Sequence, residues 1–174
     1  MLFNTDKVFS SEMRDKMISE LFSVLVIDEQ EFTEKLYMDE NQLRDLFNSG
    51  LLGLHSHSHQ SLASLSGFQI EKDLNINKMA IESIVSGKLI SISFPYGGKM
   101  DVNSEVLFAC QKNGFKLGFT MERALNSTLL NSLMFARLDT NDVLGGKNPM
   151  FKFSGNNLDI LHGMSSQRNL FFKE

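Results

Sequence analysis

Short apolar runs alternate with longer amphipathic segments in the middle of the chain, and this alternation restricts the fold more than any other feature of the sequence. Four of the runs have the length of strands and lie at residues 51–54, 89–94, 116–120 and 133–138. The apolar spacing of the segments between them predicts helices, at residues 70–86 and 103–113. Strands that alternate with helices favour an α/β fold with parallel strands, either a layered sheet or a barrel.

Three further helices are predicted before residue 50. The first begins at the serine pair of residues 10–11 and carries apolar side chains at four-residue spacing, and the second is a short acidic helix at residues 30–36. Asp39 and Gln42 have the spacing of a capping box and predict the start of the third helix. Gly50 stands where a left-handed residue would end that helix.

The composition limits the class of protein. The 174 residues, 42% of them hydrophobic and 22% charged, are enough for one globular domain over residues 1–174. The net charge of −4 argues against general nucleic-acid binding, which usually needs a basic surplus. No apolar run reaches the roughly 20 residues of a membrane span, and residues 1–15 lack the pattern of a signal peptide. We therefore expect a cytoplasmic protein.

Three of the four histidines lie within five residues, at His55, His57 and His59, directly after the predicted strand at residues 51–54. In an extended segment the three rings would point the same way, about 6.6 Å apart. In a helix, His55 and His59 would share one face at the spacing with which two imidazoles bind one metal ion. Imidazole suits zinc and neighbouring transition metals, so a metal site is predicted here. The alternative is a polar surface turn without a function.

The histidine segment reads Gly53-x-His55-Ser56-x-x-His59, and the run Ser93-Phe-Pro-Tyr-Gly closes the next predicted strand. Both lie at the carboxyl ends of strands, where active residues collect in α/β folds. The histidine segment resembles the second motif of the polysaccharide deacetylases, the NodB-like enzymes of carbohydrate esterase family 4. The Pro-Tyr-Gly turn resembles their third motif. The resemblance extends over about residues 30–145 and includes the later segments Gly114-Phe115 and Arg137-Leu138-Asp139.

The resemblance implies a partial or distorted (β/α) barrel. It also implies a metal-dependent hydrolase that removes N-acetyl groups from the sugars of a bacterial surface polysaccharide or its precursor. His55 and His59 would be ligands of a divalent metal, zinc by ligand type, which would polarise the acetyl carbonyl and activate a water. The backbone N–H of Tyr96 would stabilise the oxyanion, Arg137 would orient carboxylates, and His162 would be the catalytic acid. The implied partner is an N-acetylated sugar polymer, with no nucleic acid and no membrane span.

The chain departs from the family pattern in two places. The first motif of the family, an adjacent Asp pair that supplies the general base and a third metal ligand, is absent, and Asp28 after an apolar run is the nearest substitute. Ser93 stands where the family often has an arginine. Arg137 would take over the function of that arginine, or would form a surface or structural ion pair instead. Two histidines alone leave a catalytic metal under-coordinated. We therefore expect a chain that lacks the first strand and helix of the barrel.

An alternative function follows from this departure. The chain would then be a catalytically incomplete metal- or carbohydrate-binding remnant, or one piece of a split enzyme whose partner supplies the Asp pair. A barrel that lacks a strand exposes a sheet edge with unpaired backbone groups, and such an edge predicts self-association.

The remaining aromatic, cysteine and acidic residues are assigned to structure. Three phenylalanines of the second half are predicted to lie in the core: Phe108, Phe115 and Phe119. The single cysteine, Cys110, excludes an internal disulfide and lies among apolar neighbours, so it is also predicted to be buried. Asp139 and Asp142 are predicted to be solvated loop carboxylates.

Overall fold

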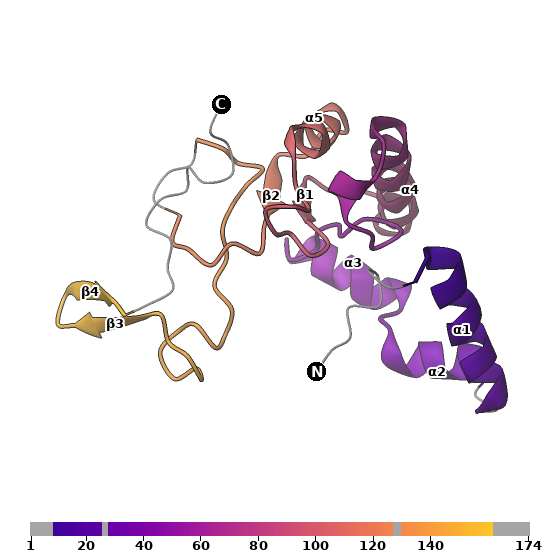
Figure 1. The fold of residues 1–174 in the computed structure, drawn as a ribbon, viewed down its shortest axis with the longest axis horizontal. Helices are drawn as coiled ribbons and strands as arrows, with labels where there is room; N and C mark the ends of the chain where they lie inside the picture. The colour runs from indigo at the N-terminus through magenta and orange to yellow at the C-terminus, as the bar shows by residue number, and fades with distance from the viewer. Residues whose placement is uncertain (1–8, 26–27, 127–129, 162–174) are drawn as a thin grey trace. The chain divides into compact units, whose positions relative to one another are not determined.

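The computed structural model describes residues 9–25, 28–126 and 130–161 (Figure 1). The chain divides into two compact units, Met1–Leu43 and Arg44–Glu174. The candidate site lies in the second unit. Among the helices of the described residues, none has the length and apolar content that a membrane span requires.

The first unit contains the helices α1 (Ser11–Val24) and α2 (Glu29–Leu36), both predicted from the sequence. Ser10 caps α1, because its hydroxyl accepts a hydrogen bond from the backbone N–H of Met13 at 3.3 Å. Asp28 caps α2, because one carboxylate oxygen accepts from two backbone N–H groups of the first turn. The carboxylate that the sequence offered as a substitute metal ligand is therefore a helix cap.

Helix α3 (Glu40–Asn48) leads into the segment that carries the histidines. The predicted capping box is present: the Gln42 side chain accepts from the Asp39 backbone N–H at 3.0 Å, and Asp39 accepts from Gln42 at 2.9 Å. Gly50 adopts a left-handed φ of +71°, and the N–H groups of Gly50 and Leu51 donate to carbonyls of the last helical turn. This geometry turns the chain sharply into the segment at residues 51–54.

A small parallel sheet forms the centre of the second unit. Strands β1 (Ser91–Ser93) and β2 (Leu117–Phe119) are parallel, with Ile92 opposite Gly118. Single parallel bridges add Leu54 beside Ile92 and Phe135 beside Phe119. Four predicted strand segments therefore lie side by side in chain order, with β1 and β2 adjacent in Figure 1. The α/β assignment and the parallel direction are confirmed, and the strands are shorter than predicted.

Two helices and a short 3-10 turn, η2 (Leu62–Ser64), pack beside this sheet. Helix α4 (Gly67–Val85) starts three residues before its predicted first residue, because Ser66 and Gln69 form a capping box. It ends at Val85, one residue before the predicted end, and the left-handed Ser86 caps it. Helix α5 (Ser104–Lys112) lies within the predicted range of residues 103–113, and Asn103 caps it.

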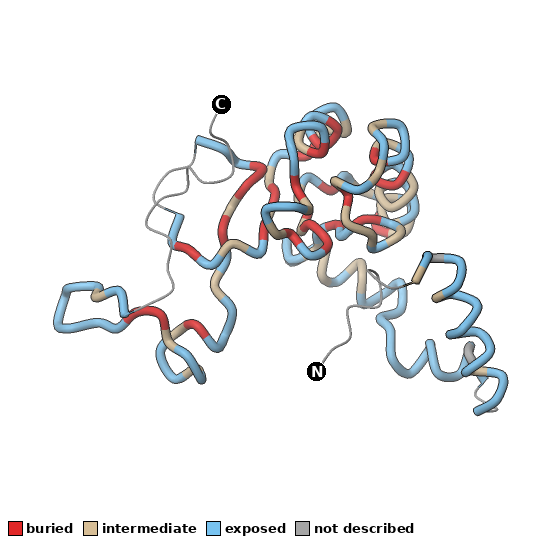
Figure 2. Tube along the Cα trace, in the orientation of Figure 1, coloured by how far each residue is buried: buried red, intermediate tan, exposed pale blue. Residues whose placement is uncertain are grey.

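The core lies between these helices and one face of the sheet, where the buried segments gather in Figure 2. Its members come from the sheet, from η2, from α4 and from α5, and include Leu54, Ile92, Leu62, Ile70, Leu74, Val106 and Cys110. Phe115 is buried as predicted and Phe119 is half-buried. The prediction for Phe108 is wrong, because this α5 side chain is 65% exposed. It lies two residues before Cys110, a spacing that points the two side chains to different sides of a helix.

The Cys110 thiol is fully buried, and burial raises its pKa to about 12. At pH 8 the reactive thiolate is therefore roughly a thousandfold scarcer than in an exposed cysteine. We expect the native protein to show no reaction with a chromogenic disulfide reagent on the timescale in which the urea-unfolded chain releases one equivalent. Equal rates in the native and the unfolded protein would contradict the buried position.

The last described segment contains an antiparallel hairpin that the sequence did not indicate. Strands β3 (Phe151–Ser154) and β4 (Asn157–Ile160) pair around Gly155, whose φ is +63°. The glycine and asparagine run at residues 155–157 is typical of a turn and does not by itself indicate the strands on either side. The hairpin has the turn residues of such a motif but only four-residue strands, too short for a clear alternation of apolar and polar residues.

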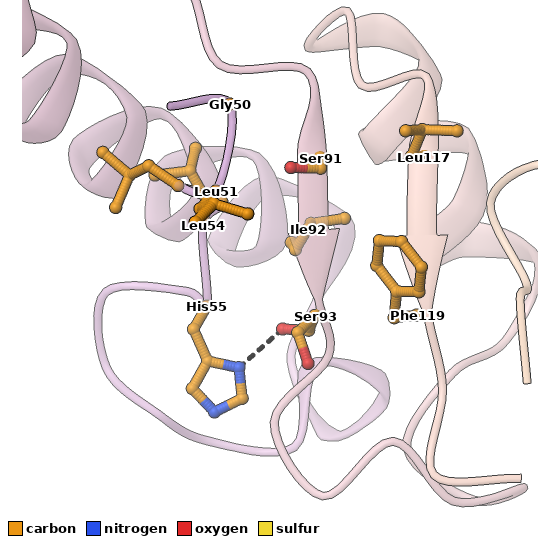
Figure 3. Close-up of a pocket in the computed structure, with 11 residues that line it drawn as sticks. Gly50, Leu51, Leu54, His55, Ser91, Ile92, Ser93, Leu117 and Phe119 are labelled. Atoms are coloured by element: carbon orange, nitrogen blue, oxygen red, sulfur yellow. Dashed lines mark hydrogen bonds between the residues drawn. The ribbon is translucent and has the colours of Figure 1, made fainter. Parts of the chain in front are cut away.

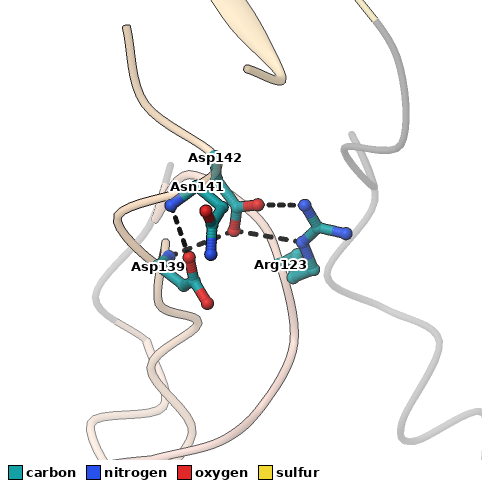
Figure 4. A network of polar contacts seen from close by, with 4 residues as sticks. All are labelled: Arg123, Asp139, Asn141 and Asp142. Carbon is teal, nitrogen blue, oxygen red and sulfur yellow. Dashed lines mark hydrogen bonds and ion pairs between the residues drawn. The ribbon is translucent and has the colours of Figure 1, made fainter. Parts of the chain in front are cut away.

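The prediction that Asp142 is a solvated loop carboxylate is wrong. Its side chain is 1% exposed and forms an ion pair with Arg123, whose Nε donates to one carboxylate oxygen at 3.0 Å (Figure 4). The backbone N–H of Asp139 donates to the same carboxylate at 3.1 Å. These contacts close the loop that contains Asn141, and they join it to a residue 19 positions earlier.

The hydrogen bond and charge of Arg123 lower the pKa of Asp142. The unfolded chain, with an ordinary pKa of about 3.9, binds a proton at a pH where the folded protein keeps this carboxylate charged. The contribution to stability is therefore complete above about pH 4 and is lost as the pH falls through the folded pKa. We expect urea midpoints to fall more steeply between pH 5 and pH 3 in the wild type than in Asp142→Asn. Parallel pH profiles would contradict this role.

Candidate active site

Parallel pairing brings the histidine segment to the end of β1. The backbone N–H of Leu54 donates to the Ser91 carbonyl at 3.0 Å, and the N–H of Ser93 donates to the Leu54 carbonyl at 2.9 Å. His55 is the next residue after this bridge. It therefore leaves the sheet at the same edge as the turn that follows β1.

The ring of His55 is held by the backbone of β1. Its Nδ1 lies 2.6 Å from the carbonyl oxygen of Ser93, as the dashed line in Figure 3 shows. A carbonyl oxygen can only accept, so Nδ1 carries the proton in this contact. In the neutral ring, Nε2 then keeps its lone pair. A hydrogen bond of this kind fixes the tautomer and the ring orientation of a metal-binding histidine.

Residues 55–59 form a turn and not the extended strand or the helix considered from the sequence. Ser56 and His59 have left-handed φ values of 64° and 53°. The Ser56 hydroxyl accepts from the backbone N–H of His59 at 3.0 Å, which closes the turn. As a result, the rings of His55 and His59 meet edge to face, with centroids 4.9 Å apart.

The Pro-Tyr-Gly turn lies beside the histidines. The backbone N–H of Gly97 donates to the Pro95 carbonyl at 2.6 Å, which makes Tyr96 the centre of a three-residue turn with a φ of 59°. A bulky residue in this conformation is strained, and such strain often accompanies a functional site. The Tyr96 ring contacts the ring of His59, with centroids 5.4 Å apart.

Arg137 reaches the same site from the segment after β2. Its guanidinium donates to the Ser93 hydroxyl at 3.1 Å, while the Ser93 carbonyl accepts from His55. The structure thus brings the Arg137 guanidinium to Ser93, the last residue of β1. Of the residues named from the sequence, it brings together His55, His59, Tyr96 and Arg137, and it places His57 in the same turn. His162 lies outside the described residues.

A cavity of about 470 Å³ borders His55 on the open face of the sheet (Figure 3). Its walls are residues 50–55, β1, and the side chains of Leu117 and Phe119 on β2.

Sequence reasoning also missed Asp73, a buried acid on α4 that accepts hydrogen bonds from the histidine turn. The sequence signal for a buried acid was the position of Asp73 between the apolar residues Ile70 and Leu74 of the predicted helix.

His55 and His59 fit two positions of a zinc site, because both are imidazoles and the tautomer of His55 leaves Nε2 available. A catalytic zinc usually has three protein ligands. Within residues 9–25, 28–126 and 130–161, no three His, Cys, Asp or Glu side chains are grouped closely enough to hold a metal ion.

Comparisons with known proteins point to one family. The family model described as polysaccharide deacetylase matches residues 21–118. A deacetylase from Streptococcus pyogenes, PplD, solved in complex with acetate, is 20% identical with a TM-score of 0.52, and the match covers 58% of this chain and 44% of PplD. The BpsB deacetylase domain from Bordetella bronchiseptica is 22% identical with a TM-score of 0.50, and the match covers 58% of this chain and 48% of that domain. No curated protein matches the sequence.

The chain thus spans less than half the length of these two solved structures, and at such identities the likeness shows the fold. The family model carries more weight, since it matches 98 of the 174 residues. The matched part contains the histidine turn and the Pro-Tyr-Gly turn that meet at the carboxyl edge of the sheet. The chain belongs to the polysaccharide deacetylase family.

Proposed function

We propose that this protein is a metal-dependent deacetylase that hydrolyses N-acetyl groups on the sugars of a surface polysaccharide or its precursor. The observation that carries the proposal is the contact of three side chains from two motifs: the ring of His59 touches both His55 and Tyr96. Family membership gives the reaction class, an amide hydrolysis that releases acetate and leaves a free amine on the sugar.

His55 and His59 would hold a divalent metal, and zinc suits their imidazole nitrogens. Such a metal supplies Lewis-acid polarisation of the acetyl carbonyl and an activated water. The Ser93 carbonyl keeps the proton of His55 on Nδ1, so that Nε2 is the ligand atom. His57 has an exposed side chain in the same turn, and we assign it no ligand role.

The other residues of the site would act on the substrate. The backbone N–H of Tyr96, fixed by the three-residue turn, would donate to the acetyl oxygen as negative charge develops there. Arg137 donates to the Ser93 hydroxyl, and the carbonyl of the same residue accepts from His55. The positive charge of Arg137 would orient the carboxylate that serves as general base. His162 would donate a proton to the leaving amine.

A second candidate function is a metal- or carbohydrate-binding module without its own activity, or one piece of a split enzyme. The absence of a three-ligand group from the described residues favours it. In this reading the exposed edges of the small sheet would bind a strand of another chain that carries the missing carboxylates. Binding of zinc and sugar without acetate release would identify this function.

Acetate release from N-acetylglucosamine oligomers tests the proposal. With zinc present, we expect release by the wild type and at least a hundredfold less by the double variant His55→Ala/His59→Ala. The variant His57→Ala is the matched control and should keep its activity, because its side chain is exposed and its backbone contact remains. A folded, zinc-loaded wild type that releases no acetate would contradict the enzymatic proposal and support the binding module.

A further inference from the structure

Helix α4 carries an acidic residue on its buried face. Asp73 is 7% exposed and lies between Ile70 and Leu74, both of which belong to the core. Carboxylates are almost never buried at this level without partners that compensate the charge. The contacts of Asp73 therefore indicate why an acid occupies this position.

Both carboxylate oxygens of Asp73 accept from the histidine turn. Oδ1 accepts from the backbone N–H of His57 at 2.8 Å, and Oδ2 accepts from the backbone N–H of Ser58 at 2.8 Å. Hydrogen bonds to a charged carboxylate are shorter and stronger than those between neutral groups. One side chain thus holds two successive peptide groups of a loop that lies 15 residues earlier in the chain.

The two donors lie between the left-handed residues of the turn. Ser56 and His59 flank them, with φ values of 64° and 53°. Non-glycine residues keep such a conformation only when the surrounding structure holds it. The sheet fixes His55 on one side, but His59 depends on the path of the turn. The Asp73 carboxylate and the Ser56 hydroxyl are the contacts that set this path.

We propose that Asp73 is a positioning residue of the deacetylase site, which keeps the ring of His59 beside that of His55. This inference rests on the proposed function, in which these two rings share one metal ion. Asp73 acts through the backbone of His57 and Ser58, so its loss should widen the distribution of distances between the two rings.

Asp73→Asn is the diagnostic variant. It keeps the size of the side chain but replaces one acceptor oxygen by an NH₂ group, which would face a backbone donor. Two variants of α4 serve as controls. Leu74→Ala removes a buried core side chain from the same helix and lowers stability, while the Asp73 carboxylate stays in place. Glu71→Gln makes the same change of charge at an exposed ion pair with Lys112.

Two quantities are measured on the wild type and the three variants, at a temperature where all are folded. The first is amide hydrogen exchange of His57 and Ser58 without metal. The second is zinc affinity, by competition with a chromophoric chelator. In Asp73→Asn we expect fast exchange at the amide that faces the NH₂ group and a 10- to 100-fold loss of zinc affinity, the usual effect of losing a residue that supports metal ligands. Both controls should stay within about twofold of the wild type for zinc.

Slow exchange of these amides in Asp73→Asn, or zinc affinity within twofold of the wild type, would overturn the inference. So would an equal loss of zinc affinity in Leu74→Ala, since the effect would then follow from stability alone. If the wild type binds no zinc, the proposed metal site fails, and hydrogen exchange alone decides whether Asp73 holds the turn. Failure of the positioning role and failure of the proposed function are thus distinguishable.

Discussion

Replacing His55 or His59 by alanine is expected to weaken zinc binding more than about a hundredfold. Residues that merely support metal ligands cost 10- to 100-fold when they are lost, so the loss of a ligand should cost more. The variant His55→Ala also loses the hydrogen bond between the His55 ring and the Ser93 carbonyl. The measurement is competition for zinc with a chromophoric chelator at pH 7.5, with circular dichroism to show that the variants are folded.

The matched control for these variants is His57→Ala. Its side chain lies in the same turn and is exposed, while the backbone N–H that donates to Asp73 stays in place. We expect its zinc affinity to remain within about twofold of the wild type. If His57→Ala weakens zinc binding as much as the other two, the ion is bound by the histidine tract in general and not by the assigned pair.

The second large effect is expected for Gly118→Ala, which should lower the free energy of unfolding by about 3 kcal/mol. Gly118 lies in the middle of β2, and its N–H and C=O bond to Ser132 and Phe135 of the neighbouring segment. An added Cβ would overlap the Leu133 carbonyl group, with its carbon only 2.7 Å away. The two backbones would have to move apart, which breaks the pairing that brings Arg137 to the site.

Urea unfolding of Gly118→Ala measures this effect, and Gly145→Ala is the control. Gly145 is left-handed but has open space around its Cβ position, so its substitution should cost only about 1 kcal/mol, the conformational penalty. Equal midpoints for the two variants would show that the close approach at Gly118 does not exist in solution.

Features that depend on neighbours in the sequence were predictable. The five α-helices of the described residues follow from apolar spacing and from caps within three or four residues, such as the Asp39 and Gln42 pair. The chain order of the parallel segments follows from the alternation of strands and helices. The two site motifs were recognisable because each is a contiguous run, with His55 and His59 four residues apart.

Features that depend on distant pairs were not predictable. The shape of the histidine turn depends on its hydrogen bonds to Asp73. Asp73 lies on α4, and it is close to the turn only in the tertiary fold. The burial of Asp142 rests on Arg123, 19 residues earlier. The place of Arg137 beside Ser93 joins residues 44 positions apart. In each case the residue type gave a charge or a donor, but only the tertiary fold supplied its partner.

The most direct test of the central claim is the dependence of acetate release on zinc. The protein is stripped of metal with a chelator, and zinc is then added in steps while acetate is measured from N-acetylglucosamine oligomers. We expect no release without metal and recovery that saturates near one zinc per chain, with no recovery in His55→Ala/His59→Ala. Release that continues in the metal-free protein, or that returns equally in the double variant, would contradict it.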